Sequence, residues 1–572
     1  MLSSIPPVIT MQSSTERAAP GAGVKVEMTT KRSDLTATID LLAKPGTGPA
    51  RQRRPVYVDL LPPCNDACPA GEDIQAWLAH AQAGRYREAW LTLVRDNPLP
   101  AVHGRVCYHP CESHCNRAQV DSEVSIHAVE RFLGDLATRE GWQLPIEARP
   151  TGKRVLVVGA GPSGLSAAYQ LARLGHAVEI RDAGPLPGGM LHFGIPAYRL
   201  PREELMKEVR AIQAMGVSIV LNHKVDDVLA EQEAGRFDAV FLAVGAQLGK
   251  RIEIPARDAS RMVTAVSLLR DAATGEAPKL GRRVVVYGAG NTAMDAARTA
   301  RRLGAEEALI VYRSDPRHMK AKAFEVEEAI EEGVKIKWLT SIKSFDGTDL
   351  TVEEMELGAD GRPHATGRVE ILSADAVVLA VGQDTDTGFL RKVPGIELQP
   401  DGVVVVGPNM MTGRPGIFAG GDMVPTERTV TAGVGHGKKA ARHIDAWLRG
   451  AEYRPAPKHP MVSFEMLHLP VYSDAERSVQ KTLPVTERVS SFSEVQAGLG
   501  AKEATYEAKR CLSCGNCFEC DQCYAACPEQ AIAKLGPGLG YRYLYDRCTG
   551  CAVCFDTCPC HAIEMIPERA GE

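Results

Sequence analysis

Two glycine-rich turns, each set between an apolar strand and a helix, constrain the fold of this chain most strongly. The first lies in RVLVVGAGPSGLSAAYQLARLGHAVEIRDAG, residues 154–184, and places GxGxxG at Gly159, Gly161 and Gly164. These glycines permit a tight turn, close approach of a pyrophosphate to a helix N-terminus, and packing of helix on strand. A lone GxGxxG also fits an ordinary tight turn. Because Asp182 then ends the second strand, where an acid accepts hydrogen bonds from ribose, we predict a dinucleotide site.

A second unit of the same kind follows in RRVVVYGAGNTAMDAARTARRLGAEEALIVYRSD, residues 282–315. Its turn reads GxGxxA at Gly288, Gly290 and Ala293, and its second strand ends at Arg313, where the first unit has an acid. An arginine there pairs with a 2′-phosphate, although a solvated surface arginine is the alternative. Two units imply either two bound dinucleotides or one site and one relic.

Two further segments return the chain to the first site. VFLAVGAQLGKRIEIPA, residues 240–256, and GIFAGGDMVPTERTVTAGVGHGKKAARHI, residues 416–444, each place a strand before glycines, and Asp422 follows Gly421. The chain thus begins the first site, continues into an inserted second unit, and then returns to the first site. This is the order found in flavoproteins that bind two dinucleotides. This order predicts a flavin facing a nicotinamide.

Long stretches of residues 60–450 resemble the small subunit of bacterial glutamate synthase. The relatives of that subunit include the large subunit of NADH-dependent ferredoxin:NADP oxidoreductase and the N-terminal half of dihydropyrimidine dehydrogenase. The resemblance rests on NPLPAVHGRVCYHPCESHCNR (97–117), PGGMLHFGIPAYRLP (187–201), GNTAMDAARTARRLGA (290–305) and AGGDMV (419–424). It implies FAD in the first site and NAD(P)H in the second. The expected FAD contacts are Gly159, Gly161, Pro162, Ser163, Gly164, Asp182, Gly188, Gly189, Met190, Gly421 and Asp422; those for NAD(P) are Gly288, Gly290, Asn291, Thr292, Ala293, Arg313 and Gly382.

The sixteen cysteines fall in three clumps, at 64–115, 511–527 and 548–560, which favours metal binding over scattered disulfides. In the first clump, five cysteines cannot fill two sites that need four each. The resemblance implies one [4Fe–4S] cluster on Cys68, Cys107, Cys111 and Glu130. Cys64 and Cys115 match ligands of another cluster whose upstream cysteines are absent here, so a second N-terminal cluster stays open. His103 is either a substitute ligand or a plain loop histidine.

CxxCxxCxxxCP occurs twice near the C-terminus, as in bacterial two-cluster ferredoxins, where the fourth cysteine of each run binds the other cluster. A pair of zinc ribbons is the alternative. The predicted ligand sets are Cys517, Cys520, Cys523 and Cys558 for one cluster, and Cys548, Cys551, Cys554 and Cys527 for the other. Cys511, Cys514 and Cys560 lie outside this pattern, and we expect them to be spectators rather than alternative ligands or partner contacts.

These features predict a multidomain α/β protein with two Rossmann-like domains. The expected parts are a flexible tail (1–50), a helical iron–sulfur domain (51–150), an FAD domain in two parts (151–281 and 384–454), an inserted NAD(P) domain (282–383), a linker (455–507) and an α+β 2[4Fe–4S] ferredoxin domain (508–572).

Charge and the N-terminal sequence exclude several classes. The formal net charge is −5, from 66 basic and 71 acidic residues, so neither a nucleic-acid nor a membrane partner is indicated. The start lacks the order of a secretory signal, and we expect a cytoplasmic protein.

The predicted activity is electron transfer between NAD(P)H and a one-electron partner through FAD and [4Fe–4S] clusters. No acid, base or nucleophile constellation is required, because the flavin is the reactive centre. Arg313 favours NADP(H) slightly, with Arg317 compensating for Ser314, where relatives often have a second arginine.

The expected partner is a ferredoxin or a redox enzyme, such as a 2-oxoacid oxidoreductase or a sulfite-reductase-type enzyme, in a hetero-oligomeric complex. One alternative is a glutamate synthase small subunit, serving a large subunit that bears a glutaminase; the C-terminal ferredoxin domain argues against it. The other is a non-catalytic assembly subunit whose sites are relics.

Overall fold

The computed structural model describes residues 51–255, 261–469 and 473–568. By its contacts the chain divides into two units, Met1–Gly46 and Thr47–Glu572, and the described residues all belong to the second. The tail predicted for residues 1–50 lies outside the described residues. Among the residues that are described, no helix combines the length and the apolar character needed to cross a bilayer.

Short helices form the N-terminal region. They are α1 (Pro63–Ala67), α2 (Ile74–Gln82), α3 (Tyr86–Val94), α4 (Pro100–Val106), α5 (Pro110–Ser113) and α6 (Ile126–Glu140), with a 3-10 turn at Asn116–Gln119. Three of them, α1, α4 and α5, begin with proline, which suits a first turn because its missing N–H has no partner within the helix. Helices α4 and α6 pack closely at Gly104, because this residue has no Cβ and a Cβ there would overlap Arg131.

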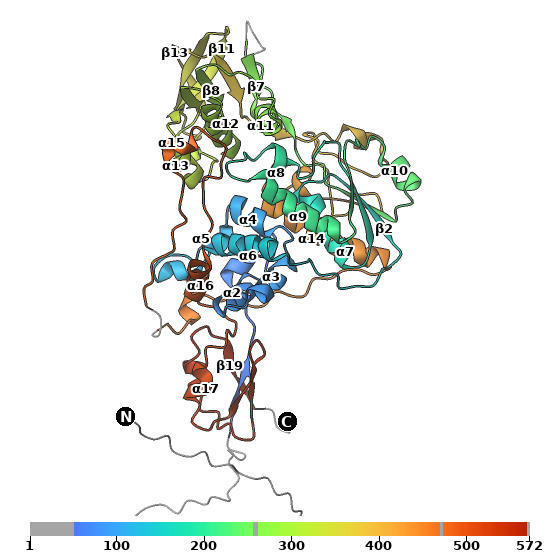
Figure 1. Ribbon diagram of the computed structural model, residues 1–572, viewed down its shortest axis with the longest axis vertical. Coiled ribbons are helices and arrows are strands. Elements are labelled where there is room, and N and C mark those ends of the chain that lie inside the picture. Colours follow the sequence, from blue (N-terminus) through green and yellow to red (C-terminus); the bar gives the residue numbers. More distant parts are fainter. Residues whose placement is uncertain (1–50, 256–260, 470–472, 569–572) are drawn as a thin grey trace, which may run out of the picture. The chain divides into compact units, whose positions relative to one another are not determined.

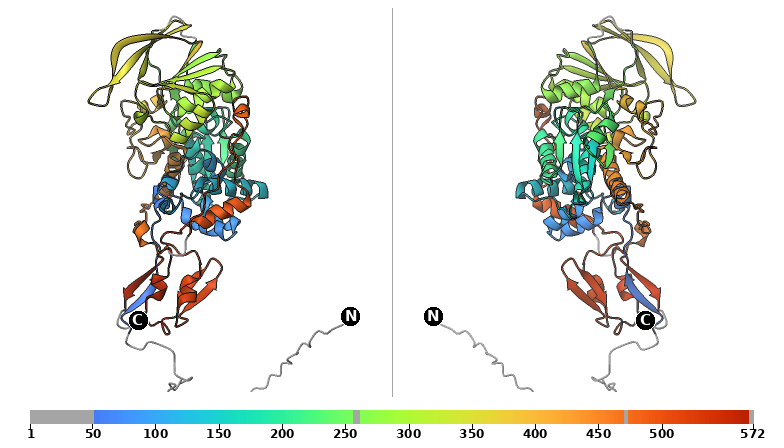
Figure 2. Two further views of the ribbon diagram at one scale, coloured as in Figure 1. Left: turned by 90° about the vertical axis from the view of Figure 1, so that its left-hand side faces the viewer. Right: turned by 90° about the vertical axis from the view of Figure 1, so that its right-hand side faces the viewer.

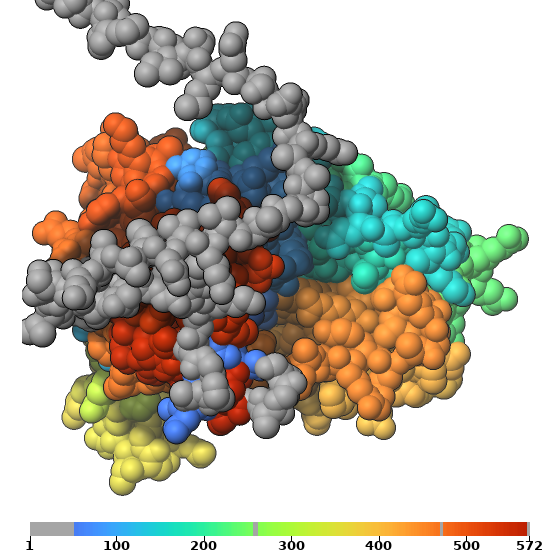
Figure 3. All heavy atoms as spheres, turned by 90° about the horizontal axis from the view of Figure 1, so that it is seen from below, coloured from blue at the N-terminus to red at the C-terminus, as the bar shows by residue number. Residues whose placement is uncertain are grey.

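The first glycine-rich unit builds a parallel sheet of five strands. In spatial order they are β16 (Ile417–Ala419), β5 (Ala239–Leu242), β2 (Arg154–Val158), β3 (Ala177–Arg181) and β4 (Ser218–Val220). The continuous apolar sequence of β2 and β5 fits strands that are covered on both faces. Helices α7 (Pro162–Arg173) and α14 (Val430–Leu448) pack on each other, and Figure 3 shows their segments, cyan and orange, side by side. Helices α8 (Met190–Phe193), α9 (Arg202–Ala214) and α10 (Val228–Ala234) complete this domain.

The second unit builds another parallel sheet of five strands. Their order is β10 (Lys335–Lys337), β9 (Glu307–Val311), β8 (Arg283–Tyr287), β14 (Ala376–Leu379) and β7 (Met262–Thr264), with helices α11 (Ala265–Thr274), α12 (Asn291–Arg302) and α13 (Ala323–Glu331). An antiparallel sheet of β11 (Thr340–Phe345), β12 (Asp349–Leu357) and β13 (Pro363–Ser373) is appended. Strand β7 precedes residue 282, so this sheet begins before the predicted boundary.

The connections between the two parallel sheets pair with each other. Strand β6 (Leu248–Gly249) leads out of the first sheet and β15 (Gln383–Asp384) leads back, and they are antiparallel. Strand β16 enters the first sheet only after the second sheet is complete. The first sheet is therefore built from two stretches of chain that flank the second.

The C-terminal region contains two short helices and two small antiparallel pairs. Its elements are α17 (Gln522–Ala526), β17 (Ile532–Gly536), β18 (Gly540–Tyr543), α18 (Val553–Asp556) and β19 (Ile563–Pro567). Strand β1 (Arg53–Tyr57) pairs with β19, and Figures 1 and 2 show this blue strand beside the red one. The sequence analysis assigned β1 to the N-terminal helical domain, but its backbone partner is C-terminal.

The stretch predicted as a linker, residues 455–507, contacts several domains. It contains α15 (Val485–Arg488) and the start of α16 (Ala501–Arg510). Arg488 forms an ion pair of 2.8 Å with Glu331 of α13, and α16 packs against α2 and α6 through Ala504 and Ala508. The described part of this stretch is therefore packed against both the second sheet's domain and the N-terminal helices.

Candidate functional site

The first glycine-rich turn borders a cavity of about 410 Å³, lined by Gly159, Gly161 and Asp182 among others. The Asp182 carboxylate accepts backbone N–H groups from Ala160 and Gly184, both at 2.7 Å. It therefore fixes the two loops at the mouth of the cavity. Each carboxylate oxygen keeps a further acceptor site for a ribose hydroxyl.

A second cavity, of about 430 Å³, lies between the two glycine-rich units and is called the flavin cavity below. Of the predicted residues it is lined by Gly161, Pro162, Ser163, Gly189, Met190, Gly421 and Asp422 from the first unit, and Gly290, Asn291, Thr292 and Gly382 from the second. Two predicted contacts, Gly164 and Gly188, line neither cavity. Gly164 packs against the turn, and the Gly188 N–H donates to the Ala160 carbonyl at 2.8 Å, so both shape the loop.

The lining of these cavities fits a dinucleotide. A Cβ on Gly161, the N-cap residue of α7, would meet no atom within 4 Å, which leaves the helix N-terminus open to a pyrophosphate. Ser163 Oγ is buried without a hydrogen-bond partner among the described residues. Burial raises the pKa of Asp422 to about 6. Buried polar groups of this kind require partners, which the hydroxyls and phosphates of a bound cofactor would supply.

The second unit borders a cavity of about 440 Å³, lined by Gly288, Gly290, Thr292, Arg313 and Gly382 of the predicted residues. Ala293 is buried in the core of this unit and lines neither this cavity nor the flavin cavity.

Lys320 was not predicted from sequence, yet it borders both this cavity and the flavin cavity. Its backbone N–H donates to the Ala289 carbonyl at 3.3 Å, which folds the loop over the turn. No motif marks this lysine.

The structure places Arg317, which the sequence analysis expected to compensate for Ser314, on the surface outside this cavity. Its side chain is 83% exposed and forms an ion pair of 2.9 Å with Asp315, and it is absent from the cavity lining. Arg313 and Lys320 are therefore the cations that border this cavity.

Arg199 joins the two dinucleotide-binding units. Its guanidinium donates to the Asp295 carboxylate of α12 at 2.9 Å and contacts Glu325 of α13 at 2.6 Å. Arg199 and Asp295 also line the flavin cavity. Sequence analysis missed this clamp because its members are about a hundred residues apart and belong to no motif.

Four predicted cluster ligands lie together at the ends of α1 and α4 and on α5 and α6. They are Cys68, Cys107, Cys111 and Glu130, and they are called the inner site below. Burial, then the nearby Cys107 and Cys68 among other groups, raises the pKa of Cys111. Glu130 accepts from the Asn97 amide at 2.8 Å. His103 lies 3.8 Å from the Glu130 carboxylate, so the histidine belongs beside the inner site and not with Cys64 and Cys115.

Cys107 adjoins the flavin cavity. Its neighbours in sequence, Val106 and Tyr108, both line that cavity. The Thr431 hydroxyl, on α14 of the FAD-type domain, donates to the Cys107 sulfur at 3.0 Å. The inner site is thereby fixed against the domain that carries the first glycine-rich turn.

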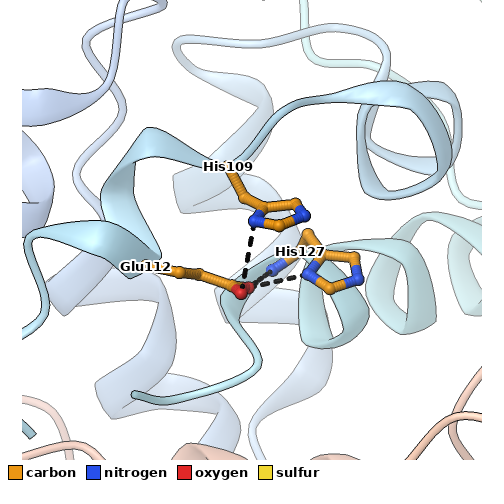
Figure 4. A group of neighbouring side chains, drawn as sticks. All are labelled: His109, Glu112 and His127. Carbon is orange, nitrogen blue, oxygen red and sulfur yellow. Dashed lines mark hydrogen bonds and ion pairs between the residues drawn. The ribbon is translucent and has the colours of Figure 1, made fainter. Parts of the chain in front are cut away.

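A buried ion network holds α5 against α6 next to the inner site. Figure 4 shows His109 and His127 directed at the Glu112 carboxylate, and His127 Nδ1 lies 2.7 Å from it. Arg477 also forms an ion pair with Glu112, at 2.7 Å. His127, His109 and Arg477 together outweigh burial and lower the pKa of Glu112 to about 2. Because this carboxylate already has two imidazoles and the Arg477 guanidinium as partners, we interpret the group as structural.

Cys64 and Cys115 line a small cavity together with Cys511 and Cys514. The sequence analysis expected Cys511 and Cys514 to be spectators. The structure places them beside two predicted cluster ligands, a proximity that the sequence analysis did not predict.

The predicted C-terminal ligand sets come together in the structure. Burial, then the neighbouring Cys523, Cys520 and Cys558, raises the pKa of Cys517. Cys527, Cys548, Cys551 and Cys554 border one cavity. Cys560 is buried with its sulfur 3.8 Å from that of Cys558. The hydroxyl of Tyr57, on β1, lies 3.4 Å from the Cys523 sulfur, so the N-terminal strand adjoins a predicted ligand.

Two family profiles match the chain. Pyridine nucleotide-disulphide oxidoreductase matches residues 153–437, and dihydropyrimidine dehydrogenase domain II, 4Fe-4S cluster, matches residues 59–142.

Individual relatives agree with the profiles. The chain is 36% identical to the NADP(+)-dependent formate dehydrogenase subunit beta of Moorella thermoacetica, over 79% of this chain and 70% of that one. It is 35% identical to the NADPH-Fe(3+) oxidoreductase subunit beta of Geobacter sulfurreducens, over 84% and 79%. The chain belongs to the family of glutamate synthase small-chain-like NAD(P)H-dependent iron–sulfur flavoproteins.

Members of this family are oxidoreductases, and this one is an NAD(P)H-dependent flavin enzyme with an N-terminal 4Fe–4S domain. The glutamate synthase [NADPH] small chain of Escherichia coli is 34% identical, over 68% of this chain and 89% of that one.

Proposed function

We propose that this enzyme moves electrons between NAD(P)H and a one-electron partner through FAD and [4Fe–4S] clusters. The observation that carries the proposal is the position of Cys107, an inner-site residue flanked by Val106 and Tyr108 of the flavin cavity. A bound flavin accepts a hydride as two electrons and releases electrons singly to a cluster. The two kinds of centre are therefore needed together in one chain.

The residues between the two glycine-rich units support the hydride step. The flavin cavity and the second-unit cavity share several lining residues, including Gly290, Thr292, Lys320 and Gly382. A nicotinamide bound in the second-unit cavity would therefore be adjacent to a flavin bound in the flavin cavity. Arg313 lies two residues beyond the end of β9 and lines the second-unit cavity, and we infer that it pairs with a 2′-phosphate. We therefore propose NADP(H) as the preferred nicotinamide.

The C-terminal region is proposed to be a ferredoxin domain with two [4Fe–4S] clusters. Its support is the grouping of Cys517, Cys520 and Cys523 with Cys558, and of Cys527 with Cys548, Cys551 and Cys554. Crossed use of the fourth cysteine is the signature of two-cluster ferredoxins.

Two relatives are named as beta subunits, one of a formate dehydrogenase and one of an NADPH-Fe(3+) oxidoreductase. We accordingly propose that this chain is a subunit of a hetero-oligomeric complex, and that its ferredoxin domain exchanges single electrons with a partner redox subunit or a ferredoxin. A glutamate synthase small subunit is less well supported, because that relative matches only 68% of this chain.

Anaerobic titration of the purified protein with NADH and then NADPH tests the proposal. We expect the flavin absorbance to bleach, at lower concentrations of NADPH than of NADH. A protein that binds no flavin, or whose flavin neither nucleotide bleaches, contradicts it.

A further inference from the structure

The cysteines at 511 and 514 lie close in space to two cysteines near the other end of the chain. Cys64, Cys115, Cys511 and Cys514 line one cavity of about 20 Å³, whose other walls include Pro62, Pro63, Leu78, Val124, Ile126 and Leu512. All four cysteines are free. We propose that these four residues, here called the bridging site, bind a further [4Fe–4S] cluster between the inner site and the ferredoxin domain. This inference deepens the proposed function and rests on it.

The docking of α16 explains why the two ends of the chain meet. Arg510, the last residue of α16, is buried and donates to Asp121 at 3.1 Å and to the Ser122 carbonyl at 2.7 Å. Arg117 in turn donates to the Arg510 carbonyl at 3.3 Å. These bonds fix residue 511 beside the segment that follows Cys115. The approach is therefore built into the fold by buried charge-assisted contacts.

Backbone and side-chain donors point at the sulfurs of this site, as they do at predicted cluster ligands elsewhere. The N–H of Ser513 donates to the Cys511 sulfur at 3.4 Å, two residues along the chain. The same arrangement occurs at Cys107 and at Cys548. In addition, the Asn116 amide donates to the Cys514 sulfur at 3.5 Å. Hydrogen bonds to ligand sulfurs are characteristic of iron–sulfur sites and tune their potentials.

The spacing of the sulfurs favours a cluster over a single ion. Among the described residues, two groups of three or more metal-ligating side chains have their ligand atoms within 4.8 Å of one another, and neither contains a cysteine. A tetrahedral zinc ion with sulfur at about 2.3 Å holds its thiolates closer together than this. A [4Fe–4S] cubane has iron at four of its eight corners and binds one cysteine thiolate at each iron, so its four thiolates lie farther apart than those around a single zinc ion.

A count of ligands supports the same assignment. The inner site takes three cysteines and Glu130, the bridging site takes four cysteines, and the two ferredoxin sites take eight. Fifteen of the sixteen cysteines are then used, together with one glutamate, which gives four ligands to each of four clusters. Cys560 is the one cysteine left over.

The bridging site also connects the other sites in order. Cys64 and Cys68 lie four residues apart at α1, and Cys111 and Cys115 at α5, so each short helix contributes to both N-terminal sites. Cys514 is three residues from Cys517 of the ferredoxin domain. Each transfer moves one electron, which oxidises the donor cluster and reduces the next, with no bond made or broken.

Iron, acid-labile sulfide and zinc contents of the anaerobically purified full chain test the assignment without any nicotinamide. Four [4Fe–4S] clusters predict about 16 irons per chain. The double variant Cys511→Ala, Cys514→Ala and the single variant Cys64→Ala, from opposite ends of the chain, are each expected to lose about four irons, one cluster's content. Cys560→Ala is the matched control and is expected to lose none.

A wild-type content of about 12 irons, with or without a zinc ion, overturns the proposal. So does a double variant that retains its iron, or a Cys560→Ala protein that loses as much as the other two. If a variant fails to fold, the iron content of the wild-type protein still decides between three clusters and four. A failed nicotinamide titration, by contrast, refutes the proposed function and leaves the iron count standing.

Discussion

The hydrogen bond between Thr431 and Cys107 predicts a measurable change in one cluster potential. Thr431 is buried on α14, and its hydroxyl donates to the Cys107 sulfur at 3.0 Å. The reduced cluster carries one more negative charge than the oxidised cluster, so a donor to its sulfur stabilises the reduced form more. Thr431→Val removes the donor and nearly conserves the shape of the side chain. The potential of the inner cluster should therefore fall.

The size of the fall follows from the contacts that remain. The His109 N–H still donates to the same sulfur at 3.2 Å, so one of two donors is lost. A net difference of about 1 kcal/mol between the two redox states corresponds to about 40 mV for one electron. An EPR-monitored redox titration measures this shift. The matched control is Thr299→Val, because Thr299 is buried on α12 and its hydroxyl has no partner among the described residues.

Only the inner cluster should change, to lower potential, and the control should match wild type. An unchanged or higher potential in Thr431→Val refutes the placement of a cluster at Cys107. A shift of the same size in the Thr299→Val control refutes it as well.

Three further substitutions test other parts of the account. Arg313→Ala removes the cation proposed to bind the 2′-phosphate, so KM for NADPH should rise about tenfold or more, the equivalent of about 1.4 kcal/mol, while KM for NADH changes little; equal changes refute the role. Gly161→Ala places a methyl group in the open space at the N-terminus of α7. The purified variant should therefore hold several-fold less flavin than wild type, while its circular dichroism spectrum stays the same. Gly388→Ala, at a glycine that also has open space around it, should keep its flavin. Glu332→Gln breaks the buried pairing of Glu332 with Arg298 and Arg302 and should destabilise the second sheet's domain by about 3 kcal/mol in denaturant unfolding, unlike Glu327→Gln on the exposed face of α13. The arginines hold the pKa of Glu332 below its usual value against the effect of burial, so the stability difference should be complete near neutral pH and shrink as pH falls below about 4.5.

Local sequence patterns predicted those site residues whose neighbours in the structure are also their neighbours in the sequence. The turn at Gly159 and Gly161 was predictable because strand, turn and helix are consecutive, and the proposed crossed use of Cys527 and Cys558 rests on a repeated motif. The same reasoning failed where contacts between distant segments of the chain determine which residues meet. Cys511 joins Cys115 through the side chain of Arg510, and Arg199 reaches Asp295 across two domains. Neither contact leaves a periodic signal in the sequence.

Strand β1 is a further case of docking over distance. Its residues gave no indication of a partner near residue 565, and the pairing places Tyr57 beside Cys523. The pairing of β1 with β19 closes a loop of about 500 residues. Residues near either strand do not specify such a distant partner, so the pairing depends on the whole fold.

Electron exchange between nicotinamide and the clusters tests the central claim most directly. EPR spectra would be recorded anaerobically on the holoprotein in two directions, after adding NADPH to the oxidised protein and after adding NADP+ to dithionite-reduced protein. The account predicts that cluster signals appear in the first experiment or disappear in the second, according to the cluster potentials. Clusters that stay silent with NADPH and stay reduced with NADP+ would contradict it.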